Sequence, residues 1–228
     1  MSVARAVHRE IHTRLPGMPI SWFVVRIFVA GATGVLGAGL TPLLISAGFE
    51  VAGMTRSAGK AALLRESGAE PIVCDVYDAA ALEQAVRRCA PDLVVHQLTD
   101  LPDDAAELAA GRAANARMRR EGTANLIAAA QAAGVKRFVA QSVAWQLSGD
   151  GKAAVEYLEE SVLGIGGVVL RYGQFYGPGT YYPDASALPD PPRIHVAEAT
   201  ARTVVALELA SGVYSVTEDS RMDFEPVQ

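Results

Sequence analysis

A short apolar run that passes directly into three closely spaced glycines constrains the fold of this chain more than any other segment. Residues 27–30 are apolar, Gly31, Gly34 and Gly37 follow, and a helix-like stretch begins at Val35. Such glycines permit a tight turn and a close approach of backbone N–H groups to an anion, which the N-terminus of the helix then faces. This order predicts a pyrophosphate-binding loop, with a purely steric role for the glycines as the alternative.

Apolar runs and helix-like stretches alternate along most of the chain. The expected strands are residues 25–30, 50–54, 71–74, 93–96, 137–141, 167–170 and 213–216. The expected helices are residues 35–47, 58–67, 79–89, 152–163 and 197–210, with a long alanine-rich stretch at 105–133. Residues 172–193, which are rich in Gly, Pro and Tyr, are expected to be loop, and residues 194–196 could be extended. Strands without polar alternation are typical of a parallel sheet that helices cover on both faces. We therefore expect an α/β fold, a doubly wound parallel sheet of the Rossmann type.

Composition narrows the class of protein further. The chain has 228 residues, half of them apolar, and a formal net charge of −5, so one substantial core is expected. Because no basic patch dominates, we do not expect a nucleic-acid partner. Cys74 and Cys89 have no metal-ligand spacing and form no disulfide framework. They favour a reducing, cytoplasmic setting, and we expect no metal site.

The first 24 residues are expected to form an N-terminal extension. They begin with a basic segment, but the apolar run at 20–30 is interrupted by Arg26 and supplies the first predicted strand. We therefore expect neither a secretion signal nor a membrane span. A loosely held extension is the simpler interpretation, and a functional arm or an oligomer contact is the alternative.

Five segments, taken in order along the chain, resemble the motifs of one family. They are Gly31-Ala32-Thr33-Gly34-Val35-Leu36-Gly37, Cys74-Asp75-Val76, Asn115 with residues 121–126, residues 134–142, and Leu170-Arg171-Tyr172-Gly173. From about residue 25 to residue 218 the chain thus resembles the extended short-chain dehydrogenase/reductase family, in particular its NAD(P)-dependent epimerase/dehydratase group. The resemblance implies a NAD(P)-binding Rossmann domain over residues 25–228, of which residues 172–228 form a reduced C-terminal substrate lobe.

The resemblance also implies which residues bind the cofactor. They are Gly31, Thr33, Gly34, Val35, Leu36, Gly37, Arg56, Asp75, Val76, Gln97 and Asn115. NAD-preferring relatives have an acidic residue at the end of the second strand, where this chain has Thr55-Arg56-Ser57. Arg56 can pair with a 2′-phosphate, so we expect NADP as the cofactor, with NAD as the alternative.

Catalysis in the family normally uses a Tyr-x-x-x-Lys pair and a serine. Ser142 matches the serine and Lys152 resembles the lysine, but Ser148 stands four residues before Lys152, where the tyrosine belongs. Tyrosines that could replace it are Tyr157, Tyr176, Tyr181 and Tyr182, although packing is the simpler role for each. His96, at the end of a predicted strand, is either a hydrogen-bonded structural residue or a substrate contact.

Two functions follow from these expectations. The first is an NAD(P)-dependent oxidoreductase or epimerase that transfers hydride to or from a carbonyl or carbinol of a small metabolite or nucleotide sugar. The alternative is a catalytically impaired dinucleotide-binding module, a sensor or scaffold, because the tyrosine is missing. We expect a dinucleotide and a small molecule as partners, no membrane partner, and leave a homodimer open.

Overall fold

The computed structural model describes residues 25–184 and 186–220, so the predicted extension at residues 1–24 lies outside the described residues. A parallel sheet with the strand order β3-β2-β1-β4-β5-β6-β9 forms the centre of the fold. Its strands are β1 (Arg26–Ala30), β2 (Glu50–Thr55), β3 (Glu70–Val73), β4 (Leu93–His96), β5 (Arg137–Val143), β6 (Val168–Tyr172) and β9 (Gly212–Val216). The predicted doubly wound parallel sheet is confirmed.

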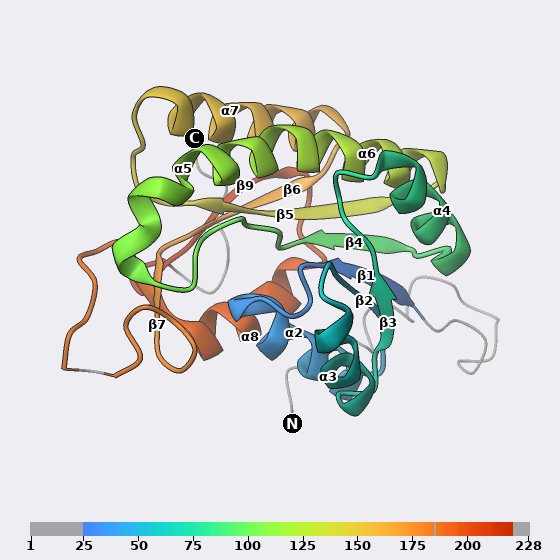
Figure 1. Cartoon of the computed structure of the whole chain (residues 1–228), viewed down its shortest axis with the longest axis horizontal. Coiled ribbons are helices and arrows are strands. Elements are labelled where there is room, and N and C mark those ends of the chain that lie inside the picture. The colour runs from blue at the N-terminus through green and yellow to red at the C-terminus, as the bar shows by residue number, and fades with distance from the viewer. Residues whose placement is uncertain (1–24, 185, 221–228) are drawn as a thin grey trace.

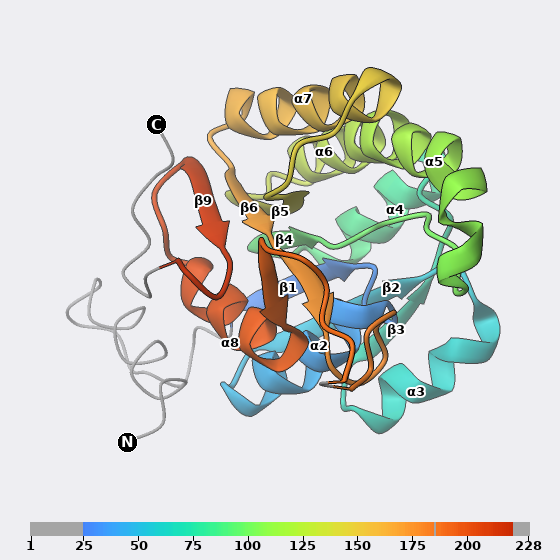
Figure 2. The ribbon, with the colours of Figure 1, turned by 90° about the vertical axis from the view of Figure 1, so that its left-hand side faces the viewer.

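Helices cover both faces of the sheet (Figures 1 and 2). One layer holds α4 (Ala79–Cys89), α5 (Leu108–Arg117), α6 (Thr123–Ala132) and α7 (Gly149–Gly164). The other holds α2 (Val35–Ser46), α3 (Ala61–Glu66) and α8 (Val196–Ala206). Within the described parts of the chain, no helix combines the length and the apolar character that crossing a bilayer would require.

Each face of the sheet has its own apolar core, and β1 supplies side chains to both. Ile27 and Val29 belong to the cluster that includes α2 and α8, whereas Phe28 and Ala30 belong to the cluster that includes α4, α6 and α7. All four side chains are fully buried. A strand buried on both faces has no reason to alternate with polar residues, which explains the uninterrupted apolar runs of the sequence.

The alanine-rich stretch at residues 105–133 is divided into several helical segments. After a short 3₁₀ turn at Ala105–Glu107, a π-helical turn at Met118–Gly122 separates α5 from α6. The wider turn changes which residues face the sheet. Asn115 before it accepts a hydrogen bond from the backbone of Asp100, and Thr123 after it bonds to His96. These two polar contacts therefore fix α5 and α6 to the segment around the end of β4.

Two smaller elements also differ from the sequence expectations. Residues 172–193 were expected to be loop, but β7 (Gln174–Tyr176) forms there and pairs in parallel with β8 (Arg193–His195). The strand was missed because it is three residues long and lies between Gly173 and Gly177. The helix predicted at 58–67 starts as a 3₁₀ turn, Ala58–Lys60, before it continues as α3.

The start of α2 passes very close to the end of β1. Gly31 has a φ of +88°, which favours glycine, and a Cβ at Gly37 would lie 2.1 Å from the carbonyl oxygen of Gly31. No non-bonded carbon and oxygen can approach so closely. Only glycine at position 37 lets the helix begin at this distance from the strand.

Replacing Gly37 by alanine should therefore destabilise the fold. The methyl group would push α2 away from the Gly31 backbone. The carbonyl oxygen of Gly31 belongs to the backbone and cannot rotate aside as a side chain would. We expect the free energy of unfolding to fall by roughly 2 kcal/mol or more, measured by urea denaturation. Gly164→Ala is the control, because no atom lies within 4 Å of a Cβ there. Equal stabilities of the two variants would contradict this account of the close approach.

Candidate dinucleotide-binding site

A cavity of about 180 Å³ lies at the carboxyl ends of the central strands. Its walls come from the loop after β1, the end of β2, the segment after β3 and the segment after β4. Seven of the predicted cofactor residues line it, namely Gly31, Thr33, Gly34, Arg56, Asp75, Val76 and Gln97. Four others are not among the lining residues: Val35, Leu36, Gly37 and Asn115.

The helix α2 begins in the glycine loop, at Gly34, which lines this cavity. Gly34 donates its N–H to the Gly31 carbonyl at 3.1 Å and forms the N-cap of α2 with extended backbone. No side chain caps the helix, and its first turn carries no acidic residue. The unpaired N–H groups and the positive dipole end of α2 are therefore available to an anion at this end of the helix.

The end of β2 supplies side-chain donors at the opposite wall. The hydroxyls of Thr33 and Thr55 lie 3.0 Å apart, and the backbone N–H of Ser57 donates to Thr55 Oγ1 at 3.2 Å. These bonds fix the turn from which Arg56, Ser57 and Lys60 reach the cavity. A guanidinium, a hydroxyl and an ammonium together suit a second anionic group.

Gln97 lines the cavity with a buried amide that lies near the Tyr172 hydroxyl but makes no hydrogen bond of good geometry with any described residue. Only 5% of the residue is exposed. The nearby Tyr172 hydroxyl is bonded to Thr203 Oγ1 at 2.6 Å. Burying an unpaired amide is costly, so this side chain fits a site that a polar ligand completes.

Gly31 adds a second sign of a ligand cradle. A Cβ at this position would lie 2.8 Å from the carbonyl oxygen of Gln97, so the loop and the segment after β4 touch backbone to backbone. Asp75, across the cavity, accepts the backbone N–H of Tyr77 at 3.0 Å and keeps a carboxylate at the cavity wall. These residues fit a nicotinamide dinucleotide, with its pyrophosphate at the N-terminus of α2.

His96 has a structural position. Its Nε2 lies 2.9 Å from Thr123 Oγ1, and its Nδ1 accepts the backbone N–H of Leu98 at 3.2 Å. Complete burial lowers the pKa of His96 to about 4, so the ring is neutral at physiological pH. Since Nδ1 accepts, the proton lies on Nε2 and is donated to Thr123. The ring thus ties β4 to α6, as the hydrogen-bonded interpretation of His96 expected.

Ser142 belongs to a buried polar cluster. Its hydroxyl donates to Glu159 Oε1 at 2.5 Å, and Arg171 binds the same carboxylate through Nε at 2.9 Å and Nη2 at 2.6 Å. Only 8% of the Glu159 side chain is exposed. The cluster joins β5, α7 and β6, and the hydroxyl proton of Ser142 points to Glu159.

Sequence reasoning missed Glu159, although a signal for it existed. Glu159 directly follows Leu158 and lies between Ala154 and Val162, the buried residues of α7. A carboxylate inside an apolar stripe of a helix indicates a buried partner. Its two partners, Ser142 and Arg171, lie on the strands β5 and β6 rather than on the helix, so the sequence alone did not identify them.

The structure does not bring Lys152 and Ser142 together. Lys152 Nζ lies 3.3 Å from Glu156 Oε1 on the surface of α7, and 62% of its side chain is exposed. Neither residue lines the cavity. Three tyrosines considered as replacements lie elsewhere: Tyr157 is exposed on α7, Tyr176 donates to Glu218, and Tyr181 donates to the Pro102 carbonyl.

A comparison with models of protein families identifies the family of this chain. A family model described as NAD(P)H-binding matches residues 31–162, more than half of the chain. The chain belongs to the NAD(P)H-binding family. The match begins at Gly31, directly after β1, and ends within α7, so it includes the glycine loop and the strands β2, β3 and β4, whose ends border the cavity.

Relatives of this NAD(P)H-binding protein agree with the predicted family. A Streptomyces "3-diazoavenalumate denitrifying reductase" is 36% identical over 239 residues, with 86% of this chain and 76% of the reductase aligned. Among solved structures, UDP-glucose 4-epimerase of Thermotoga maritima has a TM-score of 0.69 at 18% identity, covering 85% of this chain and 77% of the epimerase. The Bordetella bronchiseptica enzyme WbmG, in complex with NAD and UDP, has a TM-score of 0.68 at 20% identity, covering 90% and 76%. The predicted NAD(P)-binding family is confirmed, and the solved epimerase structures share the fold of this chain.

Replacing Gly34 by valine should abolish dinucleotide binding by this family member without unfolding it. Gly34 has ordinary backbone angles, and a Cβ there would lie 3.4 Å from its nearest neighbour, so the fold accepts a side chain. That side chain would enter the cavity that Gly34 lines and block approach to the backbone donors. Calorimetric titration with NADPH and NADH measures the loss. Ala38→Val, on the exposed side of the same helix, is the control, and unchanged affinity of Gly34→Val would contradict the assignment of the loop.

Proposed function

We propose that the chain is an NADPH-dependent reductase that transfers hydride to a small electrophilic substrate. The observation that carries the proposal is the set of donors at the end of β2. Arg56, Ser57 and Lys60 line the dinucleotide cavity together, and no acidic residue stands among them at the end of β2. The Streptomyces reductase supports this choice, because it is 36% identical to the chain whereas the Thermotoga epimerase is 18% identical.

The donors at the end of β2 favour NADPH over NADH. A carboxylate at this place accepts both ribose hydroxyls of NAD and repels a 2′-phosphate. Arg56 has the opposite charge and a planar group of donors that matches phosphate oxygens. Ser57 and Lys60 add a hydroxyl and a second cation on the same side of the cavity.

The rest of the cavity has a role for each remaining group. The N–H groups at the start of α2 would bind the pyrophosphate, and the Asp75 carboxylate would accept a hydrogen bond from the adenine amine. The unpaired amide of Gln97 would gain partners from the bound dinucleotide. When bound, the dihydronicotinamide supplies a hydride from its C4.

The substrate should be an acceptor that needs no protein acid. The position of the family's tyrosine holds Ser148, and the Ser142 and Lys152 side chains contact Glu159 and Glu156. Roles of Ser142 on the substrate and of Lys152 on the ribose stay predictions, and each would require the side chain to leave its carboxylate. Without a general acid, reduction of a carbonyl loses the contribution of proton transfer, about 10²–10⁴-fold in rate.

A diazonium ion meets this requirement, and the Streptomyces relative is named as a denitrifying reductase of a diazo compound. In a diazonium ion one hydride can take the place of the N₂ group. A hydrogen–carbon bond replaces the carbon–nitrogen bond, and N₂ leaves with the electron pair of the broken bond. The hydride supplies two electrons, the positive charge of the substrate is neutralised, and no proton is consumed. We propose electron-poor acceptors of this kind as the substrate class.

Deuterium transfer tests the reaction. We expect the protein, given 4-deuterated NADPH and a carboxylated arenediazonium salt, to release N₂ and to place deuterium on the carbon that carried the diazo group. The Gly34→Val variant and a reaction without protein measure the background. An aldehyde assayed in parallel should be reduced much more slowly. Folded protein that binds NADPH but accelerates neither reaction above background would overturn the proposal of a reductase.

Replacing Arg56 by aspartate should reverse the preference between dinucleotides. The new carboxylate would repel the 2′-phosphate and accept ribose hydroxyls, so we expect NADPH affinity to fall at least tenfold while NADH affinity is kept or rises. The measurement is the ratio of the two dissociation constants. Arg65→Asp changes the net charge equally at an exposed site outside the cavity and is the control. The same ratio in both variants would show that Arg56 does not contact the phosphate.

A further inference from the structure

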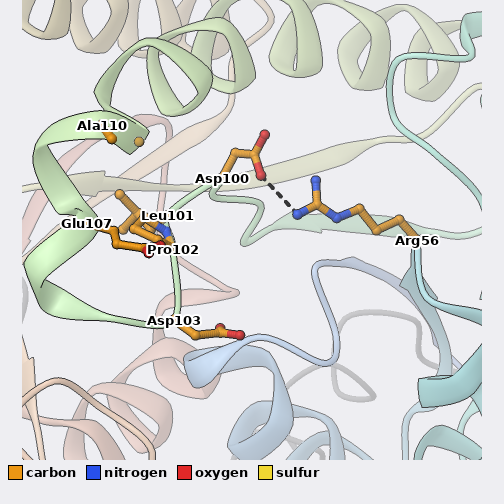
Figure 3. A pocket seen from close by; sticks show the side chains of 8 residues that line it. Arg56, Asp100, Leu101, Pro102, Asp103, Glu107 and Ala110 are labelled. Atoms are coloured by element: carbon orange, nitrogen blue, oxygen red, sulfur yellow. Dashed lines mark ion pairs between the residues drawn. The ribbon is translucent and has the colours of Figure 1, made fainter.

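Arg56 stands between two cavities. On one side is the dinucleotide cavity, and on the other is a larger space of about 380 Å³ bounded by the loop after β4 and by α5 (Figure 3). The guanidinium reaches across from the end of β2 toward Asp100, on the loop after β4. The side chain expected to bind the 2′-phosphate therefore already has a partner.

The partner is a carboxylate at ion-pair distance. Arg56 Nη2 lies 2.9 Å from Asp100 Oδ1. The arginine side chain is 64% exposed, whereas only 21% of the aspartate side chain is exposed. A long exposed arginine can reorient at little cost, but a half-buried aspartate on an anchored backbone is confined to its position.

Asp100 is anchored from two sides. Its backbone N–H donates to Asn115 Oδ1 at 3.0 Å, and Asn115 is buried on α5. Two residues further on, the Pro102 carbonyl accepts the hydroxyl of Tyr181, from the segment between β7 and β8. The loop thus holds the carboxylate in front of Arg56 and has no evident freedom to follow the guanidinium when it turns away.

We propose that Asp100 is a specificity-determining residue that competes with the 2′-phosphate for Arg56 and so limits the preference for NADPH over NADH. This inference rests on the proposed function. NADH leaves the Arg56–Asp100 pair intact. NADPH brings a phosphate that must share the guanidinium with Asp100 or displace it, and the phosphate also experiences repulsion from the carboxylate. The pair therefore weakens NADPH binding selectively.

Asp100→Asn tests the competition, because the amide keeps the size of the side chain and leaves the backbone bond to Asn115 in place. Exposed ion pairs contribute little, so we expect NADPH affinity to rise about threefold to tenfold. NADH affinity should stay within about twofold of the wild-type value. Raising the salt concentration should reduce the gain, since the competing charges are near the surface.

Two further variants isolate the interaction with Arg56. Asp103→Asn removes a carboxylate from the same loop and the same larger cavity, but no ion pair joins Asp103 to Arg56 in the described structure. It should leave the ratio of dissociation constants unchanged. In an Arg56→Ala background, Asp100→Asn should change the ratio much less, because the guanidinium for which Asp100 competes is gone and only the direct repulsion of the phosphate remains.

The outcomes separate the inference from the proposed function. Suppose that the wild-type protein prefers NADPH. If Asp100→Asn then leaves the ratio of the two dissociation constants unchanged, or if Asp103→Asn changes it equally, the inference alone is overturned. Weaker NADH binding by Asp100→Asn would also overturn it, because Asp100 would then be a ribose ligand. Folded wild-type protein that binds neither dinucleotide, or that prefers NADH while Arg56→Asp changes nothing, would overturn the proposed function and the inference with it.

Discussion

The contact between the backbone of Gly31 and the start of α2 is the constraint on which the site depends. A Cβ at Gly37 would be 2.1 Å from the Gly31 carbonyl, so strand and helix approach to a distance that no side chain allows. This proximity directs the N-terminus of α2 to the carboxyl edge of the sheet, beside the ends of β2 and β4. The anion-binding end of the helix and the donors around Arg56 thus border the same cavity.

The strand order explains why the cavity lies there. The sheet runs from β1 to β2 and β3 in one direction and from β1 to β4, β5 and β6 in the other, so the loops after β1 and β4 diverge. Ligands of open parallel sheets bind where the order reverses. Here the two sides are linked again above the sheet, through the ion pair of Arg56 and Asp100. Asn115 and the pair His96–Thr123 fix the β4 side of this link to the helix that follows.

The sequence predicted the features that depend on near neighbours. Uninterrupted apolar runs located the strands because each is buried on both faces, and α4 and β4 have the predicted bounds. The features that it did not predict depend on partners far along the chain. Glu159 is explained only by Ser142 and Arg171, and the ion pair of Arg56 depends on Asp100, more than forty residues further along the chain. The π turn between α5 and α6 likewise follows from contacts of Asn115 and Thr123 with the β4 segment, which the composition of an alanine-rich stretch does not encode.

The buried cluster of Glu159 bears on the chemistry as well as on the fold. A carboxylate that accepts from Ser142 and binds Arg171 through both oxygens is compensated in charge and in hydrogen bonds, so removing Arg171 would leave a buried charge unpaired. Such a cluster stabilises the junction of β5, β6 and α7, and it also holds the one residue that matches the family's catalytic serine. In the proposed reaction, with Ser148 in the place of the tyrosine, the protein's side chains would offer the reacting group orientation rather than a proton. The proposed reaction is then driven by the electrophile and its leaving group, and the protein's contribution is to bind the dinucleotide tightly and in one register.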